Sequence, residues 1–310
     1  MPAVSVIVLV YKVERYIERC ARSLFGQTLQ DIEYIFVDDC SPDKSMEILE
    51  QVLEDYPQRR SQVIILHNEV NRGQAYSRRR GVEAASGDYI IHCDSDDWPE
   101  SDMYAKLYAK ASSENLDMVK CFIRRVFDNH IELIPDLTAA DDFLEALLFH
   151  DIHHYLADKL IIRRAYQQGI TFPQNNMCED TAMITQLAYY CRSWGFVKEA
   201  LYNYNYSSDS ISAARDSMEK VEQIHQNVEL VFSFLDSKGL SEKYRRAIMH
   251  LKCWTKFAAL QLPRKYYVGL YPEANLPFFA DKRFTVVERM GHLTKLLGIH
   301  GISKPFKRKK

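Results

Sequence analysis

Glycine is absent from the positions where several classes of nucleotide-binding protein need it. The first glycine of the 310-residue chain is Gly26, so the turn after the first apolar run, Val10-Tyr11-Lys12-Val13, contains none. The chain also has no GxGxxG turn, P-loop, HExxH or GxSxG pattern. Dinucleotide folds and P-loops need glycine to let the backbone approach phosphate, and the same absence disfavours the glycine-rich loop of a sugar nucleotidyltransferase. Carboxylates are left to carry the chemistry.

Long apolar runs, paired cysteines and an excess of positive charge are missing too. No run approaches the roughly 18 residues of a membrane span, and residues 3–10 lack the basic flank and cleavage site of a signal peptide. The seven cysteines are scattered, odd in number and without a CxxC pair, which predicts reduced, mostly buried thiols in a cytoplasmic protein. The net charge of −2 argues against a nucleic-acid partner.

Apolar runs alternate with helical periodicity along the first 125 residues. Short apolar runs predict strands at 4–10, 34–37, 63–66, 89–93 and 118–122. Helices are expected at 14–25, 42–56, 71–85 and 99–113, with Ser41 as the N-cap of the second and Pro99 in the first turn of the last. This alternation predicts parallel βαβ units, and therefore an α/β fold with a mostly parallel sheet flanked by helices.

The rhythm changes after about residue 125. Helices are expected at 141–150 and 178–191, where Asp141-Asp142 looks like the cap of the first. Two long helices are expected at about 217–236 and 241–262, and the residues beyond them have no clear pattern. A soft boundary at 210–216 separates the α/β part from this helical part.

Three carboxylates lie within four residues in the segment Asp94-Ser95-Asp96-Asp97, directly after a predicted strand. In an open α/β sheet, ligands bind at this end of the strands. Like charges packed so closely repel each other unless a cation or hydrogen-bond donors hold them, and oxygen ligands of this kind suit Mg²⁺ or Mn²⁺. The alternative is a solvated acidic turn that caps the next helix.

Two further acidic pairs accompany this segment. Asp38-Asp39 ends the second predicted strand, so parallel strands would bring it to the same edge as Asp94, where a carboxylate can accept the N3–H of a uracil. The alternative is a helix cap. Glu179-Asp180 begins a helix, where an acidic residue is usually a cap or a partner of the helix dipole, but a carboxylate there can also take a proton from an acceptor.

Basic and aromatic clusters leave their alternatives open. Arg78, Arg79 and Arg80 are consecutive on a helix and point in different directions, so one or two face phosphates or all are solvated. The tyrosines at 202–206 are core residues or a sugar-stacking platform. Residues 304–310 carry five basic side chains. They form a solubilising tail, or they are attracted to an anionic membrane at roughly 1 kcal/mol per basic residue.

Taken together, these segments resemble the family-2 glycosyltransferases of the GT-A fold. The resemblance covers about residues 3–212 and rests on motifs in register: residues 4–11, 37–45, 71–73 with Arg78 and Gly81, 85–90, 94–97 and 179–180. Residues 158–160 and 204–212 also look like members that decorate capsules, lipopolysaccharide or other surface glycans. Two positions depart from the family pattern: Cys40 replaces a usual glycine, and Arg79 replaces a common asparagine.

The resemblance implies a nucleotide-sugar donor, UDP-linked, and a role for each matching residue. Asp39, with Asp38 beside it, would bind the uracil and ribose, and Asp94 would lie near the ribose and diphosphate. Asp96, with Asp94, would hold Mn²⁺ or Mg²⁺. Asp180 would be the catalytic base of an inverting displacement, with Glu179 orienting the acceptor or its loop. The other nucleotide-binding residues implied are Val10, Tyr11, Asn71, Gly73, Arg78 and Ser95.

The same resemblance suggests how the chain is organised. Residues 1–212 would form the GT-A domain, with a nucleotide half to about 125 and an acceptor half from 126, and residues 213–310 a helical region with the basic tail. The Gln-x-x-Arg-Trp motif of processive synthases is absent, which favours transfer of single sugars to a glycan or lipid-linked acceptor. A cytoplasmic protein, peripheral to the inner membrane face through its tail, is expected, and a homodimer is left open. The rival interpretations are a nucleotidyltransferase and a non-catalytic nucleotide-sugar binding module.

Overall fold

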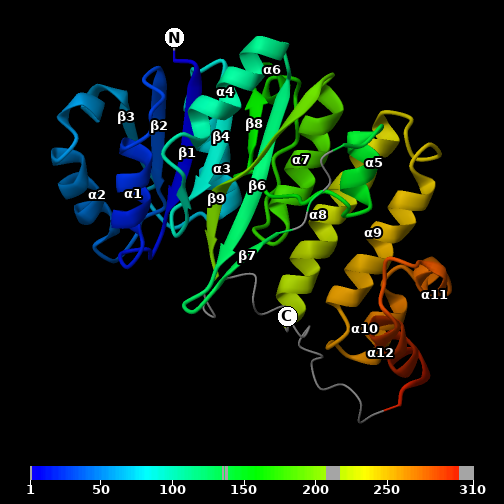
Figure 1. Ribbon diagram of the computed structural model, residues 1–310. Helices are drawn as coiled ribbons and strands as arrows, with labels where there is room; N and C mark the ends of the chain where they lie inside the picture. The colour runs from blue at the N-terminus through cyan, green and yellow to red at the C-terminus, as the bar shows by residue number, and fades with distance from the viewer. Residues whose placement is uncertain (1, 135, 137–138, 207–216, 300–310) are drawn as a thin grey trace.

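The computed structural model describes residues 2–134, 136, 139–206 and 217–299 (Figure 1). One twisted sheet occupies the N-terminal two thirds of the chain, with helices on both faces, and the C-terminal helices stand to one side of it. The expected α/β fold with flanking helices and a helical C-terminal region is confirmed. The sheet itself is mixed: among the described strands, four pairs are parallel and four are antiparallel. The predicted boundary at 210–216 falls outside the described residues.

The sheet has the strand order β3-β2-β1-β4-β8-β6-β9-β5, with β7 paired to β6. Its strands are β1 (Val4–Val10), β2 (Ile32–Asp38), β3 (Val63–His67), β4 (Tyr89–Asp94), β5 (Trp98–Pro99), β6 (Met118–Val126), β7 (Ile131–Leu133), β8 (Lys159–Ile162) and β9 (Trp194–Asn205). The first four are parallel to one another, and β6 is parallel to β9. β8 is antiparallel to both of its neighbours, β4 and β6. The fifth predicted strand therefore exists, but β8 lies between it and β4.

The helices of the α/β part are α1 (Ile17–Phe25), α2 (Ser45–Glu54), α3 (Gln74–Ala84), α4 (Met103–Glu114), α5 (Phe143–Leu148), α6 (Arg163–Tyr166) and α7 (Glu179–Tyr190), with a 3-10 helix at Pro57–Gln62. Strand β1 shows how they divide between the two faces. Val4, Val6, Val8 and Val10 pack into one core with α1, α2 and α4. Ile7, pointing the other way, packs into a second core with α5, α6 and α7. This alternation is the period of a strand covered on both faces.

Two of the predicted helix starts are wrong. Pro99 lies in β5, where it pairs with Tyr202, and α4 begins only at Met103. Ser41 does not cap α2: the N-cap residue is Lys44, and the Ser41 side chain instead accepts a hydrogen bond from the Lys12 amide. In both places a tertiary contact replaces the local motif. The predicted cap at Asp142 is confirmed, because its side chain accepts from the Glu145 amide at the start of α5.

Helices α8 (Met218–Ser237) and α9 (Arg245–Ala258) are the two long helices expected after residue 216. They pack onto α5 and α7 and share the second core. Beyond them lie α10 (Arg264–Gly269), a 3-10 turn at Pro272–Ala274, α11 (Pro277–Ala280) and α12 (Val286–Leu297), which build a small core of their own with α9. Within the described ranges, no helix has the length and apolar character needed to span a membrane.

Candidate functional site

The candidate site lies where four parallel strands end. Register pairs Val10 with Asp38, Asp38 with His67, and Leu9 with Asp94. The acidic carboxyl ends of β2 and β4 therefore lie on either side of the end of β1, as the alternation of strands and helices predicted. This side of the sheet, where the strands end, is called the strand edge below. This edge is where an open α/β sheet binds ligands.

Asp39, at the end of β2, is a clamp for the loop before α3. Its buried carboxylate accepts hydrogen bonds from the side-chain amide of Asn68 at 2.6 Å and from the backbone amides of Arg72 and Gly73 at 2.8 and 2.7 Å. Three donors on one carboxylate fix the loop, because hydrogen bonds to an ionised acceptor are strong. Gly73 adopts a φ of 85°, and a Cβ there would lie 2.8 Å from the Asn176 side chain, so glycine is required.

Asp38 turns the other way and shapes the loop before α2. It accepts from the amide of Ser41 at 2.8 Å and contacts Nδ1 of His67 at 3.0 Å. Between them Cys40 takes a left-handed φ of 57°, a conformation that glycine adopts more readily. Cys40 therefore holds a backbone conformation that would cost glycine less.

The remaining predicted nucleotide-side residues lie at the ends of β1 and β4 and in the loop before α3. Tyr11 is 38% exposed just beyond β1, and Asn71 is exposed in the loop clamped by Asp39. Val10 is buried and its carbonyl accepts from the Asp39 amide at 3.0 Å, so its contribution is backbone. Ser95 is buried in the turn after β4. An aromatic ring and an exposed amide beside a polar strand edge suit a nucleoside, which needs a stacking surface and donors.

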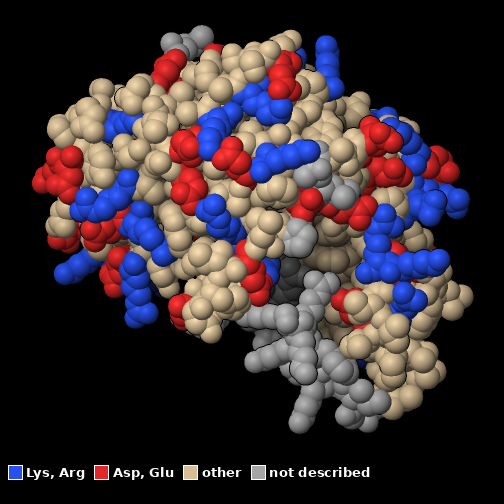
Figure 2. All heavy atoms as spheres, in the orientation of Figure 1, with Lys and Arg blue, Asp and Glu red and all other residues tan. Residues whose placement is uncertain are grey.

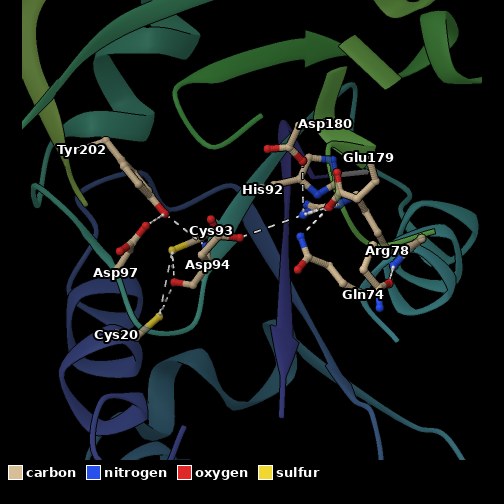
Figure 3. A network of polar contacts seen from close by, with 12 residues as sticks. Cys20, Gln74, Arg78, His92, Cys93, Asp94, Asp97, Glu179, Asp180 and Tyr202 are labelled. Atoms are coloured by element: carbon tan, nitrogen blue, oxygen red, sulfur yellow. Dashed lines mark hydrogen bonds and ion pairs between the residues drawn. The ribbon is translucent and has the colours of Figure 1, made fainter. Parts of the chain in front are cut away.

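The three carboxylates after β4 do not act together. Asp97 is fully buried and points away from the edge, accepting from the hydroxyl of Tyr202 at 2.8 Å and the amide of Asn205 at 2.7 Å (Figure 3). It ties the turn to β9, and the same Tyr202 hydroxyl accepts from the Asp94 amide. Tyr202 is thus a core residue with a structural hydroxyl. Asp94 and Asp96 remain partly exposed.

Asp94 and Asp96 fit a divalent cation that also has substrate ligands. Burial raises the pKa of Asp94 to about 6, with Asp96 and Glu179 adding to the rise and Arg78 opposing it. Burial also raises the pKa of Asp96. A cation would relieve this cost of charge. Among the described residues, no group of three or more His, Cys, Asp or Glu side chains could hold a metal, but Mg²⁺ commonly takes one or two carboxylates plus phosphate oxygens.

Arg78 is the centre of the other half of the site. Its buried guanidinium binds Oε1 of Glu179 through Nε at 3.1 Å and Nη2 at 2.8 Å. Nη2 also lies 3.6 Å from Oδ1 of Asp180 and 4.0 Å from Oδ1 of Asp94 (Figure 3). The guanidinium of Arg78, from α3, therefore joins the end of β4 to the start of α7. The arrangement is made possible by helix α3, which turns Arg79 outward to Glu83 and Arg80 towards Asn68.

Glu179 and Asp180 are neighbours with opposite electrostatic states. Burial acts to raise the pKa of Glu179, but Arg78 outweighs it and the pKa is lowered. Burial raises the pKa of Asp180 well above its usual value, and the negative charge of Glu179 raises it further. Glu179 therefore stays ionised as the partner of Arg78. Asp180, whose side chain is 28% exposed, is a carboxylate with unusually high proton affinity.

Sequence reasoning missed the residues that join the two halves. Gln74 donates to Glu179, and the side chain of Asn176 accepts from the Ala75 amide at 3.2 Å. Asn68 and Gln74 are polar residues next to motif residues, which is a weak signal. Asn176 offers no signal at all, because its contact spans 101 positions of the chain.

Residues 5–173 match the model of glycosyl transferase family 2. The relative named "Putative glycosyltransferase EpsH" of Bacillus subtilis (strain 168) is 30% identical over 258 residues, covering 80% of this chain and 73% of EpsH. EpsJ of the same organism, an uncharacterized glycosyltransferase, is 41% identical over 140 residues, covering 45% of this chain and only 39% of EpsJ.

Solved structures agree on the fold. TarS of S. aureus, in complex with UDP-GlcNAc, superposes with a TM-score of 0.62 at 17% identity, covering 96% of this chain and 92% of that one. The mannosyltransferase PcManGT of Pyrobaculum calidifontis, in complex with GDP-Man and Mn²⁺, has a TM-score of 0.60 at 17% identity, covering 95% and 84%. Identities this low support the fold alone. The family model matches more than half of the length of this chain, and the acidic strand ends that the family motifs predict are in place. This chain therefore belongs to glycosyl transferase family 2 and has the GT-A fold.

Proposed function

We propose that this protein transfers a single sugar from a UDP-sugar to a hydroxyl group, with inversion at the anomeric carbon. The observation that carries the proposal is the cluster around Arg78, which brings Asp94 from the strand edge within reach of Asp180 from α7. A donor at the edge and an acceptor held near α7 would then meet between two carboxylates of different character.

The donor side is formed by the ends of β1, β2 and β4. Tyr11, Asn71 and the rim of Asp38 and Asp39 offer a ring and polar atoms to the uracil and ribose. Both carboxylates already accept internal hydrogen bonds, but a carboxylate has about four lone-pair sites, so each can accept one more. TarS, which shares the fold, was solved with UDP-GlcNAc, which supports a uridine nucleotide.

Asp94 and Asp96 would hold Mn²⁺ or Mg²⁺ together with the diphosphate. When bound, such an ion stabilises the negative charge that builds on the leaving group. The residues themselves contribute two hard oxygen ligands at the rim, and Asp97, tied to Tyr202, keeps the turn that carries them in place. PcManGT, a neighbour in fold, was solved with Mn²⁺, which supports this choice of ion.

Asp180 would act as the base. Its oxygen takes the proton of the acceptor hydroxyl while that hydroxyl oxygen bonds to the anomeric carbon, and the carbon–oxygen bond to the diphosphate breaks with its electron pair leaving on UDP. A raised pKa suits this role, because a general base works best when its pKa approaches the working pH. Glu179 and Arg78 hold the start of α7, and so hold Asp180 in place.

The acceptor would be a growing surface glycan or a lipid-linked sugar. The resemblance of residues 158–160 to glycan-decorating members supports this acceptor class. We place the reaction in the cytoplasm, with the basic residues 304–310, which lie outside the described residues, drawing the protein to an anionic membrane face. A homodimer is compatible with this proposal and is not required by it.

The test is incubation of the purified protein with a panel of nucleotide sugars and Mn²⁺, following release of the nucleotide. A UDP-sugar should release UDP, and chelation of the metal should stop the release. No release from any donor, with tight binding of UDP retained, would instead identify a non-catalytic binding module. Release of pyrophosphate from a nucleoside triphosphate and a sugar phosphate would identify a nucleotidyltransferase.

A further inference from the structure

Helix α12 has an unusual outer face. The exposed residues of this helix are Val286, Val287, Met290, Leu293 and Leu297, with exposed fractions of 68%, 43%, 56%, 43% and 62%. Every one of them is apolar. Their spacing of four, three and four from Val286 to Leu297 places them along one side of the helix over its whole length.

The inner face of α12 is correspondingly polar. His292 is buried, stacks on Phe278 at 4.2 Å between ring centroids, and bonds the carbonyl of Asn275 at 2.8 Å. Glu288 is buried as part of a capping box with Thr285. A surface helix normally buries its apolar stripe and exposes its charges. Here His292 anchors the helix through Phe278 and Asn275, and Glu288 only caps its first turn, while most of its large apolar side chains remain outside.

The charge of the surrounding sequence is equally one-sided. From Lys282 to the end, the chain contains nine Lys and Arg residues and a single acidic residue, the buried Glu288. The charge of this segment is therefore +8, against −10 for residues 1–281. Figure 2 shows the end of the molecule over α10 and α12, at the lower right, with few charged side chains on the face in view.

We propose that the outer face of α12 is a membrane-docking surface, which lies flat on an anionic bilayer and is attracted to it by the positive charge of its own segment of the chain. A helix in the interface plane buries its apolar side among the acyl chains and leaves cations at the level of the headgroups. Twelve residues at 1.5 Å each give a helix about 18 Å long. The five apolar side chains span that length, so the helix axis would lie parallel to the surface.

Charge distinguishes a membrane from a second copy of the chain as the occupant. In a two-fold dimer the same patch meets itself, which would bring together two copies of residues 282–299, with four basic residues and one acidic residue each. Anionic headgroups complement the segment instead. The proposal does not depend on the identity of the donor sugar. The basic tail offers only electrostatic attraction to a membrane, and the apolar face of α12 would add side chains that insert into it.

The experiment is flotation of the full chain with vesicles of phosphatidylcholine, with and without phosphatidylglycerol. The test variant is Met290→Gln/Leu297→Gln, which removes apolar surface without changing the charge. The matched control is Ile131→Gln/Leu133→Gln on β7, where the side chains are 62% and 55% exposed, close to the 56% and 62% of the test pair. A third variant ends at Ser303 and lacks the five basic residues.

The parent should bind anionic vesicles, and the α12 variant should bind at least about tenfold more weakly with an unchanged Tm. The β7 control should bind like the parent. The truncated protein should lose about tenfold or more on anionic vesicles only, together with the salt dependence of binding.

Equal binding of the parent and the α12 variant would overturn the proposal, and so would failure of the parent to bind. A parent dimer in solution that the α12 substitutions dissociate would assign the face to a second copy instead. UDP release measured without vesicles should be the same in all four proteins, so a failure of docking and a failure of the proposed transfer reaction are read separately.

Discussion

The carboxylates at the ends of β2 and β4 have the same chemistry but opposite environments. Asp39 receives three hydrogen bonds from an amide side chain and two backbone amides. Asp94 has Arg78 only at 4.0 Å and has Asp96 as a neighbour of like charge, and its pKa is raised to about 6. Both sit on one sheet edge. The difference is in what surrounds each oxygen.

This contrast separates a clamp from a reactive site. Donors that are already in place make Asp39 a stable part of the loop before α3. Asp94, Asp96 and Asp180 have fewer hydrogen-bond donors, so their ionised forms are unfavourable when buried. Binding of a metal cation or of a substrate proton would stabilise them. Perturbed carboxylates collect at functional sites for this reason. Removing a carboxylate should therefore cost activity on the β4 and α7 side, but stability on the β2 side.

The largest effect is expected from Asp96→Asn. The substitution keeps the shape of the side chain but removes a charged ligand, so Mn²⁺-dependent hydrolysis of the donor should be abolished while the Tm stays at the parental value or rises slightly. Activity would be measured by UDP release and Tm by circular dichroism. Parental activity in the presence of Mn²⁺ would show that Asp96 does not hold the metal.

The next effect concerns Asp180→Asn. The donor is held elsewhere, so the affinity for UDP by calorimetry should stay near the parental value, while transfer falls by roughly 10²–10⁴-fold, as is typical for loss of a general base. Asp142→Asn is the control, because Asp142 caps α5. Intact transfer would exclude Asp180 as the base and direct attention to Glu179. Lost UDP binding would place Asp180 in the donor site.

Asp39→Asn should act mainly on stability. It replaces an ionised acceptor of three hydrogen bonds by an amide, which should lower the free energy of unfolding by about 2 kcal/mol. Urea unfolding would measure the change. Asp38→Asn, which loses one amide donor and a contact with a mostly exposed His67, should cost less. A larger loss of unfolding free energy for Asp38→Asn than for Asp39→Asn would contradict the role of Asp39 as the clamp of the loop before α3.

The smallest effect is a shift in the pH profile. Activity should fall at low pH, because the protonated form of Asp180 cannot act as a base. Since the pKa of Asp180 is raised, this fall in kcat/KM should occur at a higher pH than for an ordinary carboxylate. Glu179→Gln removes the neighbouring negative charge, so the pKa of Asp180 should fall and the limb should move to lower pH. A limb that stays in place would show that Glu179 does not tune the base.

Much of the site could be predicted because it lies in contiguous motifs. The segments at 38–39, 94–97 and 179–180 are local, and parallel strands bring their ends together without further information. Local sequence could not reveal that Asp97 turns inward to Tyr202, or that Asp39 accepts from backbone amides more than 30 positions away. Those partners are set by tertiary packing.

Strands β5, β8 and β9 were not predicted, for similar reasons. β8 has only four residues and includes the buried Lys159, whose ammonium donates to the carbonyls of His153 and Tyr155. A charged residue in so short a run hides the strand pattern. β9 is irregular, since its register with β6 shifts around Phe122. Pro99 resembled a helix start, but the two-residue strand β5 exists only because β9 lies beside it.

The ties between the two parts of the site bear on the construction of hybrid enzymes. One route to a changed acceptor is to exchange everything after β6 for the equivalent segment of a relative. Arg78 would then lose Glu179, and Asp97 would lose Tyr202 and Asn205, unless the incoming segment supplies the same three side-chain and backbone partners. Residue identity at positions 179 and 202, and the backbone position at 205, should decide which hybrids fold more than overall similarity does.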